Sequence, residues 1–231
     1  FSTGHYVRRE KRADGIFLKR ARDKTKDQSY MLYRLKKEML PYLRFPLGEY
    51  RKTEVVETAL QLGYSSASIK ESQDICFIED KYTDFIYEYT PDPRLNMPGD
   101  IVTATGEMIG KHKGFINYTI GQRKGLNLSD GPWYVTGVDA ETNTVYVGRK
   151  EEGLSSEFTA GECNWFIPAP VDSFHCMIKV RYNTPALPGR VQSLRGGTAR
   201  IILDEPAVIT PGQSAVFYHD DLVYGGGIIN R

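Results

Sequence analysis

The sequence predicts a mixed α/β segment followed by two small all-β units. Apolar residues recur about every four positions in the expected helices before residue 90, and the period then changes to two. Turn residues punctuate the rest of the chain at short intervals, as in small antiparallel sheets and closed barrels. We expect domain limits that divide the chain into 1–78, 79–154 and 155–231.

The composition is typical of a soluble globular protein. The chain has 231 residues, of which 40% are hydrophobic and 26% are charged. Its longest apolar runs are only a few residues, so we expect no membrane span, and no charged leader precedes an apolar stretch. Three cysteines without a Cys-x-x-Cys pair favour reduced thiols in the cytoplasm over a disulfide framework.

Charge is distributed unevenly along the chain. Residues 1–52 hold 15 Lys or Arg and 6 Asp or Glu, a balance of +9, whereas the remainder has a balance of −8. A basic region confined to one part of the chain suits a polyanion such as nucleic acid. A solvated basic face without a ligand would have the same composition, so charge alone leaves both interpretations open.

The first 78 residues are expected to contain a hairpin and two helices. Basic residues surround the turn signal Asp14-Gly15. The four-residue apolar spacing over 28–40, which stops at a proline, predicts an amphipathic helix. A second helix is expected over 53–62, with Thr53 as its N-cap.

After these helices the pattern predicts a third helix and then short strands. Asp80 is a candidate N-cap for a helix that ends before Pro91. Central strands, paired in an antiparallel manner, are expected over 101–105, 108–111, 133–138 and 144–147. Strands of the last unit are expected over 176–182, 199–203, 207–209, 215–218 and 222–224. The run Gly225-Gly226-Gly227 permits a bulge or a close backbone approach.

The segment Ser72-Gln73-Asp74-Ile75-Cys76-Phe77-Ile78 holds the best candidate for covalent chemistry. The Cys76 thiol can accept sulfur, form a disulfide or attack an electrophile, depending on its exposure and thiolate character. The alternative is a buried cysteine at the start of a strand. Acidic neighbours would raise the Cys76 pKa, so activation needs nearby cations, for which Lys70 is one candidate.

Two N-terminal segments have residues typical of nucleic-acid or phosphate contacts. Gly4 lets the backbone approach a phosphate closely, and His5 can donate to a phosphate oxygen, although a turn with a solvated imidazole is the alternative. A basic loop through Lys26, Asp27 and Gln28 leads to a helix N-terminus, where anions are favoured. Asp27 can instead simply cap that helix.

Two further basic segments lie in the predicted β units. Tyr118–Leu126 is expected to be a strand followed by a basic, glycine-bounded loop. Lys179 and Arg181 are expected on one face of a strand, with Val180 and Tyr182 on the other. Such cations beside an aromatic ring can hold a nucleic-acid backbone, but a solvated strand face is also compatible.

We expect no metal site. Zinc binding by Cys163, His175 and Cys176 is disfavoured, because adjacent strand residues point to opposite faces and the ligand spacing is absent.

An ordered set of motifs resembles a known family, the bacterial tRNA-specific 2-thiouridylases, over essentially the whole chain. The motifs are Gly4-His5-Tyr6, Lys26-Asp27-Gln28-Ser29-Tyr30, Phe45-Pro46-Leu47-Gly48, Ser72–Ile78, Tyr118–Leu126, Pro132-Trp133-Tyr134-Val135, Asn164-Trp165, Arg181-Tyr182 and Thr210-Pro211-Gly212-Gln213. An older name of the family is tRNA methyltransferase, but no S-adenosylmethionine signature occurs here.

The resemblance implies a fold and an activity. The fold is a doubly wound ATP-pyrophosphatase (PP-loop) α/β domain, of which 1–78 would be the C-terminal part, then a small central β domain and a C-terminal antiparallel β-barrel. The activity is ATP- and Mg²⁺-dependent 2-thiolation of the wobble uridine, position 34, of tRNA. The sulfur is relayed as a cysteine persulfide from a donor protein. Such an enzyme would be cytoplasmic.

The resemblance also implies roles for individual residues. Cys76 matches the cysteine that carries the persulfide, and Gly4 matches a residue at the ATP site. The residues that match tRNA contacts are His5, Lys26, Asp27, Gln28, Arg181, Tyr182 and Gln213.

Two parts of the family pattern are missing from this sequence. Neither the phosphate-binding Ser-Gly-Gly-x-Asp-Ser loop nor the second catalytic cysteine occurs, and the chain starts at Phe1 in what reads as a strand. We therefore expect a fragment that does not thiolate tRNA by itself. A non-catalytic tRNA-binding module and a thiol redox protein without RNA remain as alternatives.

Overall fold

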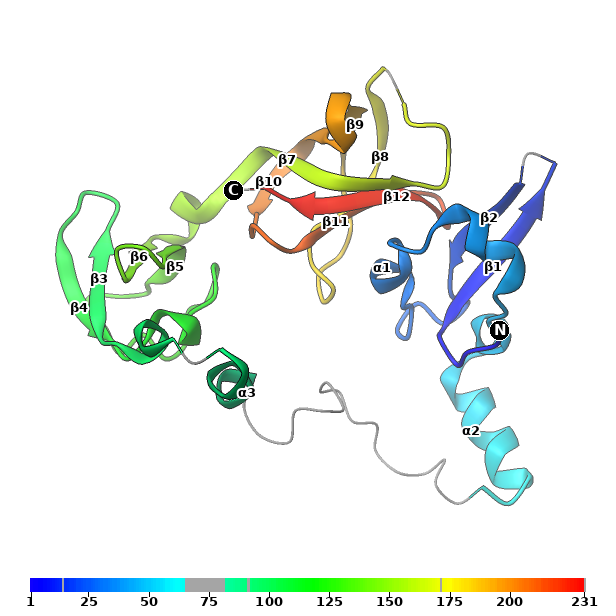
Figure 1. The fold of residues 1–231 in the computed structure, drawn as a ribbon, viewed down its shortest axis with the longest axis horizontal. Coiled ribbons are helices and arrows are strands. Elements are labelled where there is room, and N and C mark those ends of the chain that lie inside the picture. The colour runs from blue at the N-terminus through cyan, green and yellow to red at the C-terminus, as the bar shows by residue number, and fades with distance from the viewer. Residues whose placement is uncertain (14, 65–81, 91, 171, 231) are drawn as a thin grey trace. The chain divides into compact units, whose positions relative to one another are not determined.

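The computed structural model describes residues 1–13, 15–64, 82–90, 92–170 and 172–230 (Figure 1). The chain forms two compact units. The first contains the described residues before position 65 together with 156–206 and 210–230, and the second contains 82–155 and the short stretch 207–209. No helix within the described ranges is long and apolar enough to cross a membrane.

An eight-stranded sheet organises the first unit. Its strand order is β1-β2-β12-β11-β8-β9-β10-β7, and an additional pairing of β12 with β7 closes the last six strands into a barrel. This confirms the expected C-terminal barrel. The strands are β1 Val7–Arg12, β2 Gly15–Arg20, β7 Leu154–Trp165, β8 Phe174–Lys179, β9 Leu187–Ser193, β10 Ala199–Val208, β11 Ser214–His219 and β12 Leu222–Ile229.

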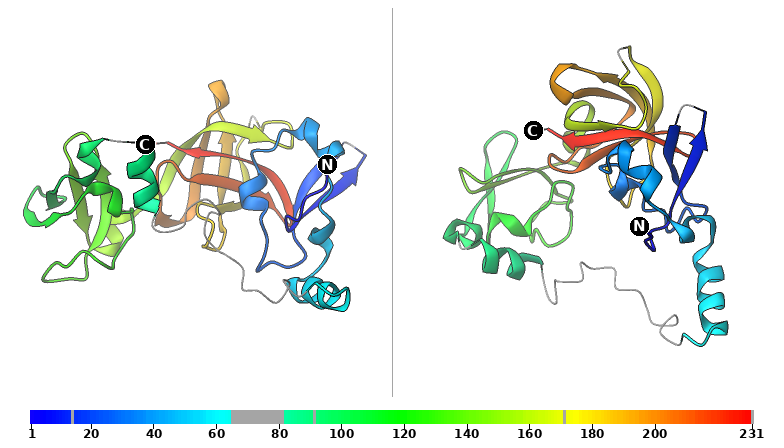
Figure 2. Two further views of the ribbon diagram at one scale, coloured as in Figure 1. Left: turned by 60° about the horizontal axis from the view of Figure 1, so that its bottom comes forward. Right: turned by 45° about the vertical axis from the view of Figure 1, so that its right-hand side comes forward.

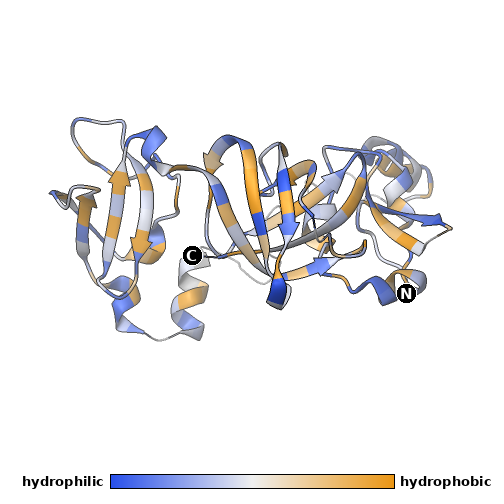
Figure 3. Cartoon of the chain, turned by 90° about the horizontal axis from the view of Figure 1, so that it is seen from above, coloured by the Kyte–Doolittle hydropathy of each residue, from blue (hydrophilic) through white to orange (hydrophobic). Residues whose placement is uncertain are grey.

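Alternating burial shows why these residues form barrel strands. In β10, Ala199, Ile201 and Leu203 are buried, whereas Arg200 and Ile202 between them are exposed. The two-residue period places the buried set on one face of the strand. Apolar and polar residues alternate along the barrel strands in Figure 3.

Two barrel strands were not predicted from the sequence. The twelve residues of β7 lack a simple alternation, and Glu162 within it has a positive φ of 49°. The β9 strand contains Pro188 and Gly189, which normally argue against a strand. A Cβ atom at Gly189 would lie 2.5 Å from the carbonyl oxygen of Ile202, so the tight pairing of β9 with β10 explains this glycine.

The glycine run in β12 serves the close approach that the sequence predicts. A Cβ atom at Gly226 would lie 2.6 Å from Cδ2 of Tyr33, and one at Gly225 would lie 2.5 Å from the Asn164 carbonyl oxygen. The pairing of β12 with β7 also shifts register between Gly226 and Ile228. The absence of side chains therefore lets both β7 and the N-terminal segment pack against β12.

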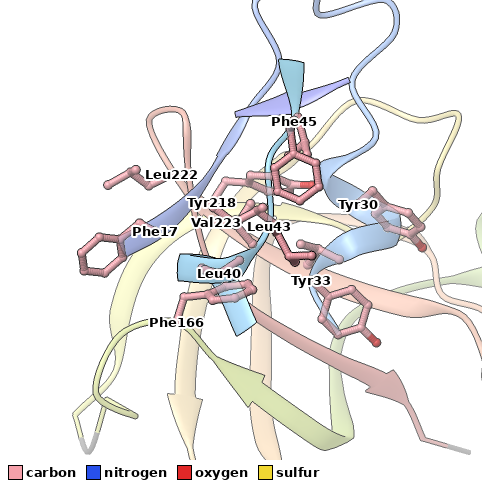
Figure 4. Close-up of a cluster of buried hydrophobic side chains, with 13 residues drawn as sticks. Phe17, Tyr30, Tyr33, Leu40, Leu43, Phe45, Phe166, Tyr218, Leu222 and Val223 are labelled. Carbon is pink, nitrogen blue, oxygen red and sulfur yellow. The ribbon is translucent and has the colours of Figure 1, made fainter. Parts of the chain in front are cut away.

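The N-terminal segment shares a hydrophobic core with the barrel. The expected hairpin is present as β1 and β2, and Lys19 of β2 pairs with Leu222 of β12. The hairpin lies beside one end of β12 in both views of Figure 2. Figure 4 shows the shared core, in which Leu40 and Phe45 from the N-terminal segment pack with Phe166 and Tyr218 from the barrel region.

The single helix expected over 28–40 is wrong. A four-residue helix, α1 Ser29–Leu32, is followed by the separate 3-10 helix η1 Lys37–Tyr42. The side-chain amide of Asn164 donates to the carbonyl oxygens of Tyr33 and Leu35, just past α1. These bonds satisfy carbonyls that a continuing helix would have used, so a tertiary contact overrides the local pattern.

The second expected helix is confirmed as α2 Lys52–Gln61, which follows the 3-10 helix η2 Pro46–Glu49. Its N-cap is Arg51 rather than the predicted Thr53. The Glu54 carboxylate accepts from the Arg51 backbone N–H at 2.7 Å, and Asp23 Oδ2 accepts from the Lys52 N–H at 3.0 Å. Acidic side chains thus satisfy the free donors at this end of the helix.

A four-stranded sheet with the order β4-β3-β6-β5 forms the second unit. The expected all-antiparallel pairing is wrong for one pair, because β3 and β6 run parallel, with Asp100 opposite Thr144. The elements are α3 Tyr82–Tyr89, η4 Pro93–Asn96, β3 Gly99–Thr103, β4 Met108–His112, η5 Phe115–Asn117, β5 Tyr134–Asp139, β6 Thr144–Gly148 and η6 Lys150–Gly153. The 3-10 helix η7 Arg195–Gly197 belongs to the first unit.

The strand expected at the start of Tyr118–Leu126 is also wrong. Residues 118–133 form a loop between η5 and β5, and its Leu126 side chain is buried in the core of this unit with Ile101, Val135 and Val145. The apolar residues of the motif therefore fill a core without pairing in the sheet. The predicted helix cap Asp80 lies outside the described residues.

Candidate nucleic-acid interface

Asp27 organises the loop that leads into α1. Its Oδ1 atom accepts from the backbone N–H of Ala21 at 2.9 Å and of Ser29 at 3.2 Å, and its Oδ2 atom accepts from the Ser29 hydroxyl at 2.8 Å. Gln28 is assigned as the N-cap of α1, without a side-chain cap. Asp27 therefore stabilises the loop one residue before the N-cap. Its bonds to Ser29 resemble the predicted capping, although Asp27 is not itself the N-cap.

Gln28 joins this loop to the start of β1. Its Oε1 atom accepts from the Tyr6 N–H at 2.8 Å, and its own backbone N–H donates to the Tyr6 carbonyl oxygen at 2.9 Å. Lys26, half-buried in the same loop, donates its backbone N–H to the Asp23 carbonyl oxygen at 3.1 Å. The loop that carries Lys26 is thus a hydrogen-bonded structure, and Gln28 joins it to Tyr6, directly before β1.

Gly4 and His5 come directly before the residue that Gln28 holds. His5 is half-buried, and its Nδ1 atom lies 2.7 Å from the Thr3 hydroxyl oxygen. Gly4 is exposed, and a Cβ atom there would meet only Leu47 Cδ1 at 3.7 Å, an ordinary contact. Gly4 is therefore not required by close packing in the described part of the fold, and its exposed backbone can be approached by a ligand.

Arg181 is fixed at the end of β8. The strand ends at Lys179, and the Arg181 guanidinium donates to the hydroxyl of Thr210, which lies just before β11. Partial burial lowers the Arg181 pKa from its ordinary value. This group remains a cation at neutral pH, because the ordinary pKa of arginine is above 12.

Lys179 lies near two tyrosine rings. Its Nζ atom is 5.8 Å from the ring centre of Tyr30 and 5.5 Å from that of Tyr182, and the two rings are 6.0 Å apart. Burial lowers the Lys179 pKa, and the Asp27 carboxylate opposes that effect. The result is a cation held by aromatic rings and an acidic loop, a grouping suited to a phosphate and a base together.

The expected alternation of residues 179–182 across one strand is wrong. Val180 is 3% exposed, whereas Tyr182 is 42% exposed, so these two residues do not share one face. Because the strand stops at Lys179, the chain turns and brings the Tyr182 ring back toward Lys179.

Tyr30 connects the N-terminal loop to the barrel. Its hydroxyl donates to the Ser214 carbonyl oxygen at 2.9 Å, and burial raises its pKa to about 12. Gln213 precedes this acceptor; its backbone N–H donates to the Thr210 carbonyl oxygen at 3.2 Å, and its own carbonyl oxygen accepts from Ile229 at 2.8 Å. The Gln213 loop therefore adjoins both the Arg181 anchor and the Tyr30 anchor.

The structure brings most of the predicted contact residues into one connected region of the first unit. The connection runs from His5 through Tyr6 to Gln28 and Asp27, and then through Tyr30 to the barrel. The sequence did not predict the participation of Tyr30, Thr210 or Ser214. Their roles become visible only when the fold brings distant segments together. The Lys-x-Arg-Tyr spacing of residues 179–182 was a partial signal, because it marked the segment that Tyr30 and Thr210 contact.

Arg20 and Tyr218 contact each other and, through Ser29, the loop that carries Asp27. The Arg20 guanidinium carbon lies 3.8 Å from the ring centre of Tyr218, and the Tyr218 hydroxyl lies 3.2 Å from the Ser29 hydroxyl. Burial raises the Tyr218 pKa, so its hydroxyl stays protonated. These contacts fix Ser29, which bonds Asp27, against the barrel.

The remaining predicted site lies outside the described residues. Cys76 and Lys70 fall within 65–81, so the structure gives no geometry for them. Burial raises the pKa of Cys163 to about 11 and that of Cys176 to about 12, which keeps both thiols neutral. Among the described residues, no group of three or more His, Cys, Asp or Glu side chains could hold a metal ion.

Comparisons with known proteins match the whole length of the chain. Residues 1–80 match a tRNA methyl transferase HUP domain, 83–149 a tRNA methyl transferase PRC-barrel domain, and 155–229 an aminomethyltransferase beta-barrel domain. All of this chain aligns with the tRNA-specific 2-thiouridylases MnmA of Idiomarina loihiensis, at 43% identity, and of Psychromonas ingrahamii, at 42%. The chain belongs to the tRNA-specific 2-thiouridylase family.

The 2-thiouridylases that the chain matches are longer proteins. The alignment covers 64% of the Idiomarina protein, 65% of the Psychromonas protein and 63% of a Synechococcus relative that is 42% identical. The three domain descriptions agree with the predicted order of an α/β domain, a central β domain and a C-terminal barrel. The predicted resemblance and fold class are therefore confirmed.

Proposed function

We propose that this chain takes part in 2-thiolation of the wobble uridine, position 34, of tRNA. Cys76 carries the sulfur as a persulfide, and the interface described above binds the tRNA. The observation that carries the proposal is the Lys179 cation beside the rings of Tyr30 and Tyr182, where the N-terminal loop meets the barrel. Membership of the 2-thiouridylase family supplies the reaction.

Each interface residue has a proposed role in binding. Arg181 and Lys26 neutralise backbone phosphates, His5 donates to a phosphate oxygen, and Tyr182 offers a ring for stacking with a base. Gln28 and Gln213 contact polar groups of the RNA, and Asp27 holds the loop that carries these donors. Reaching C2 of an anticodon base requires the base to leave its stack.

The proposed sulfur transfer moves the outer sulfur of the persulfide to C2 of the uridine. The outer sulfur of the Cys76 persulfide attacks C2 of an activated uridine, and the former O2 leaves with its activating group. A second thiol then attacks Cys76 Sγ, forms a protein disulfide and leaves the outer sulfur on C2 as a thiocarbonyl. An external dithiol reductant supplies the two electrons that restore both thiols.

ATP and Mg²⁺ are proposed as cofactors of the complete reaction, but the residues present do not form their site. The sequence has no Ser-Gly-Gly-x-Asp-Ser loop, and no group of metal ligands occurs among the described residues. Gly4 is exposed, so a nucleotide can approach its backbone. We propose Gly4 as a contact to ATP in the complete enzyme.

The proposal includes the setting of the reaction. A cytoplasmic persulfide donor protein loads Cys76, and the chain by itself does not complete the thiolation because it lacks the phosphate loop and a matching second cysteine. The proposed domain limits are 1–78 for the C-terminal part of the ATP-pyrophosphatase domain, 79–154 for the central β domain and 155–231 for the barrel.

Sulfur loading followed by peptide mass spectrometry tests this proposal. We expect a persulfide donor system to add one sulfur atom to Cys76 but not to Cys163 or Cys176, whose raised pKa values keep them as neutral thiols. A Cys76→Ser variant is the matched control and should take up no sulfur. An unmodified Cys76 in the loaded wild-type chain would contradict the catalytic role.

A non-catalytic tRNA-binding module is the second candidate, favoured by the Lys179 cation beside the rings of Tyr30 and Tyr182, a grouping that binding alone requires. In that case tRNA would bind with salt dependence while Cys76 remained unloaded. Absence of tRNA binding together with Cys76 oxidation would instead favour a thiol redox protein.

A further inference from the structure

The central unit contains two adjoining hollows that neither the sequence motifs nor the family comparisons assign to any ligand. The first has a volume of about 580 Å³ and lies between β4 and the loop before β5; Lys111, Lys113, Asn117 and Ser129 are among its lining residues. The second, of about 430 Å³, is lined by Arg123 and Trp133, among others. Residues 125–128 line both, so the two hollows form one extended surface.

The described walls of both hollows carry cationic side chains. Among the residues that the structure describes, Lys111, Lys113 and Arg123 line them, whereas no Asp or Glu does. This differs from the surrounding segment, because residues 82–155 hold seven Lys or Arg and ten Asp or Glu. Lys111 is neutralised by an ion pair with Asp100. The exposed side chains of Lys113 and Arg123 therefore give the hollows their positive charge.

Amide and hydroxyl groups line the first hollow beside the lysines. Asn96, Asn117, Asn127 and Tyr118 all contribute to its wall. Asn127 has a positive φ of 49°, which asparagine tolerates better than most residues. Gly125, with φ of 82°, adopts a similar conformation two residues earlier. The loop thus keeps a backbone shape that presents polar groups at the junction of the two hollows.

Trp133 adds a flat aromatic surface to the second hollow. Its indole N–H donates to the Ser129 carbonyl oxygen at 2.7 Å, and the Arg149 guanidinium carbon lies 4.1 Å from its ring centre. Arg149 is itself held by the carbonyl oxygens of Asp130 and Pro132, at 3.0 and 3.1 Å. The orientation of the ring is therefore fixed before any ligand binds.

The loop is also held from its core side. Leu126 is buried among the central core residues, and a Cβ atom at Gly110 would lie 2.5 Å from Leu128 Cδ2. Gly110 therefore makes room for the loop to pack closely on β4. A polar, cationic surface on a firmly packed loop is pre-organised for binding, which lowers the entropy cost of capturing a ligand.

We propose that these hollows form a second RNA-binding site, which takes a phosphodiester segment with an unstacked base. Lys113 and Arg123 neutralise the phosphates, the asparagine amides bond to sugar or base edges, and Trp133 stacks with the base. The site rests on the proposed function, since it would hold part of the tRNA that the barrel interface also binds. It assigns a substrate-positioning role to the central unit.

Binding of unmodified tRNA to the full chain, measured by fluorescence anisotropy over a range of salt concentrations, tests this site. We expect Lys113→Gln and Arg123→Gln each to weaken binding several-fold and to reduce the salt slope by about 1, as loss of one phosphate contact does. Both side chains are exposed, so the variants should keep the fold, which circular dichroism checks. Lys150→Gln is the matched control, an exposed charge of the same unit outside both hollows.

The outcomes separate this inference from the proposed function. If the wild-type chain does not bind tRNA, the proposed function fails, and the second site fails with it. If the wild type binds and the Lys113 and Arg123 variants match Lys150→Gln in affinity and salt slope, only the second site is overturned. Unchanged tRNA binding with reduced binding of a protein donor would likewise overturn it, because the hollows would then serve a protein.

Discussion

Lys179 illustrates how the candidate interface depends on individual side chains from distant segments. Its Nζ atom lies 5.8 Å from the ring centre of Tyr30, which comes from the N-terminal loop, and 5.5 Å from that of Tyr182 on the barrel. The sequence could predict that Lys179 and Arg181 belong to a basic segment. It could not predict Tyr30 as their neighbour, because that contact requires α1 to be placed against β11 by tertiary packing.

The Arg181→Ala variant tests the barrel side of this interface. We expect weaker tRNA binding, by up to about tenfold, with a salt slope reduced by about 1 if the guanidinium contacts a phosphate. Arg190→Ala is the control, because Arg190 is an exposed arginine on β9 of the same barrel. Filter binding at several salt concentrations measures both effects. An affinity and slope equal to those of Arg190→Ala would remove Arg181 from the interface.

Buried tyrosines predict a loss of stability at alkaline pH. Burial raises the Tyr30 pKa to about 12, from an ordinary value near 10. As the pH rises from about 10 to about 12, the unfolded chain loses this proton while the folded chain keeps it, so the free energy of unfolding falls. Urea unfolding across this pH range should show the decline. The Tyr30→Phe variant should show a shallower decline, and an identical slope would contradict the assignment.

At the scale of elements, the local sequence pattern predicted those segments whose structure does not depend on tertiary contacts that oppose the pattern. The β1–β2 hairpin and α2 follow from turn and helix signals within a few residues. The helix expected over 28–40 failed because Asn164, on β7, takes the carbonyl oxygens of Tyr33 and Leu35. The β9 strand was missed because Gly189 and Pro188 oppose a strand locally, although Gly189 is required by the close approach of β10.

The Asn164→Ala variant tests whether the Asn164 amide stabilises the segment that follows α1. Removing the amide leaves two carbonyl oxygens without their partner, so we expect the free energy of unfolding to fall by about 1–3 kcal/mol. Asn230→Ala is the matched control: its amide bonds an exposed Thr159 hydroxyl at 2.9 Å, and the loss should be smaller. Urea unfolding measures both variants. Equal losses would show that the Asn164 bonds do not hold this segment.

At the scale of the whole molecule, pairing between distant segments defines the units. Lys19 of β2 lies opposite Leu222 of β12, about two hundred residues later in the chain. Composition and periodicity could predict an α/β segment and a barrel, but they carry no signal for which edge strand the hairpin joins. The described N-terminal residues and the barrel therefore share one core, while the central sheet has a separate core.

Separate cores predict that a barrel mutation leaves the central unit unaffected. A Cβ atom at Gly226 would lie 2.6 Å from Tyr33 Cδ2 and 2.7 Å from the Ala215 carbonyl oxygen, so Gly226→Ala should destabilise the first unit by about 1–3 kcal/mol. The two tryptophans report on different units, because Trp165 belongs to β7 and packs on Phe217, whereas Trp133 is partly buried and packs against the central core. Single-tryptophan variants, made by Trp133→Phe or Trp165→Phe, allow each unit to be followed by fluorescence during urea unfolding. With Gly226→Ala added, the Trp165 transition should move to lower urea while the Trp133 transition stays in place. A common shift of both transitions would mean that the two cores unfold as one cooperative structure.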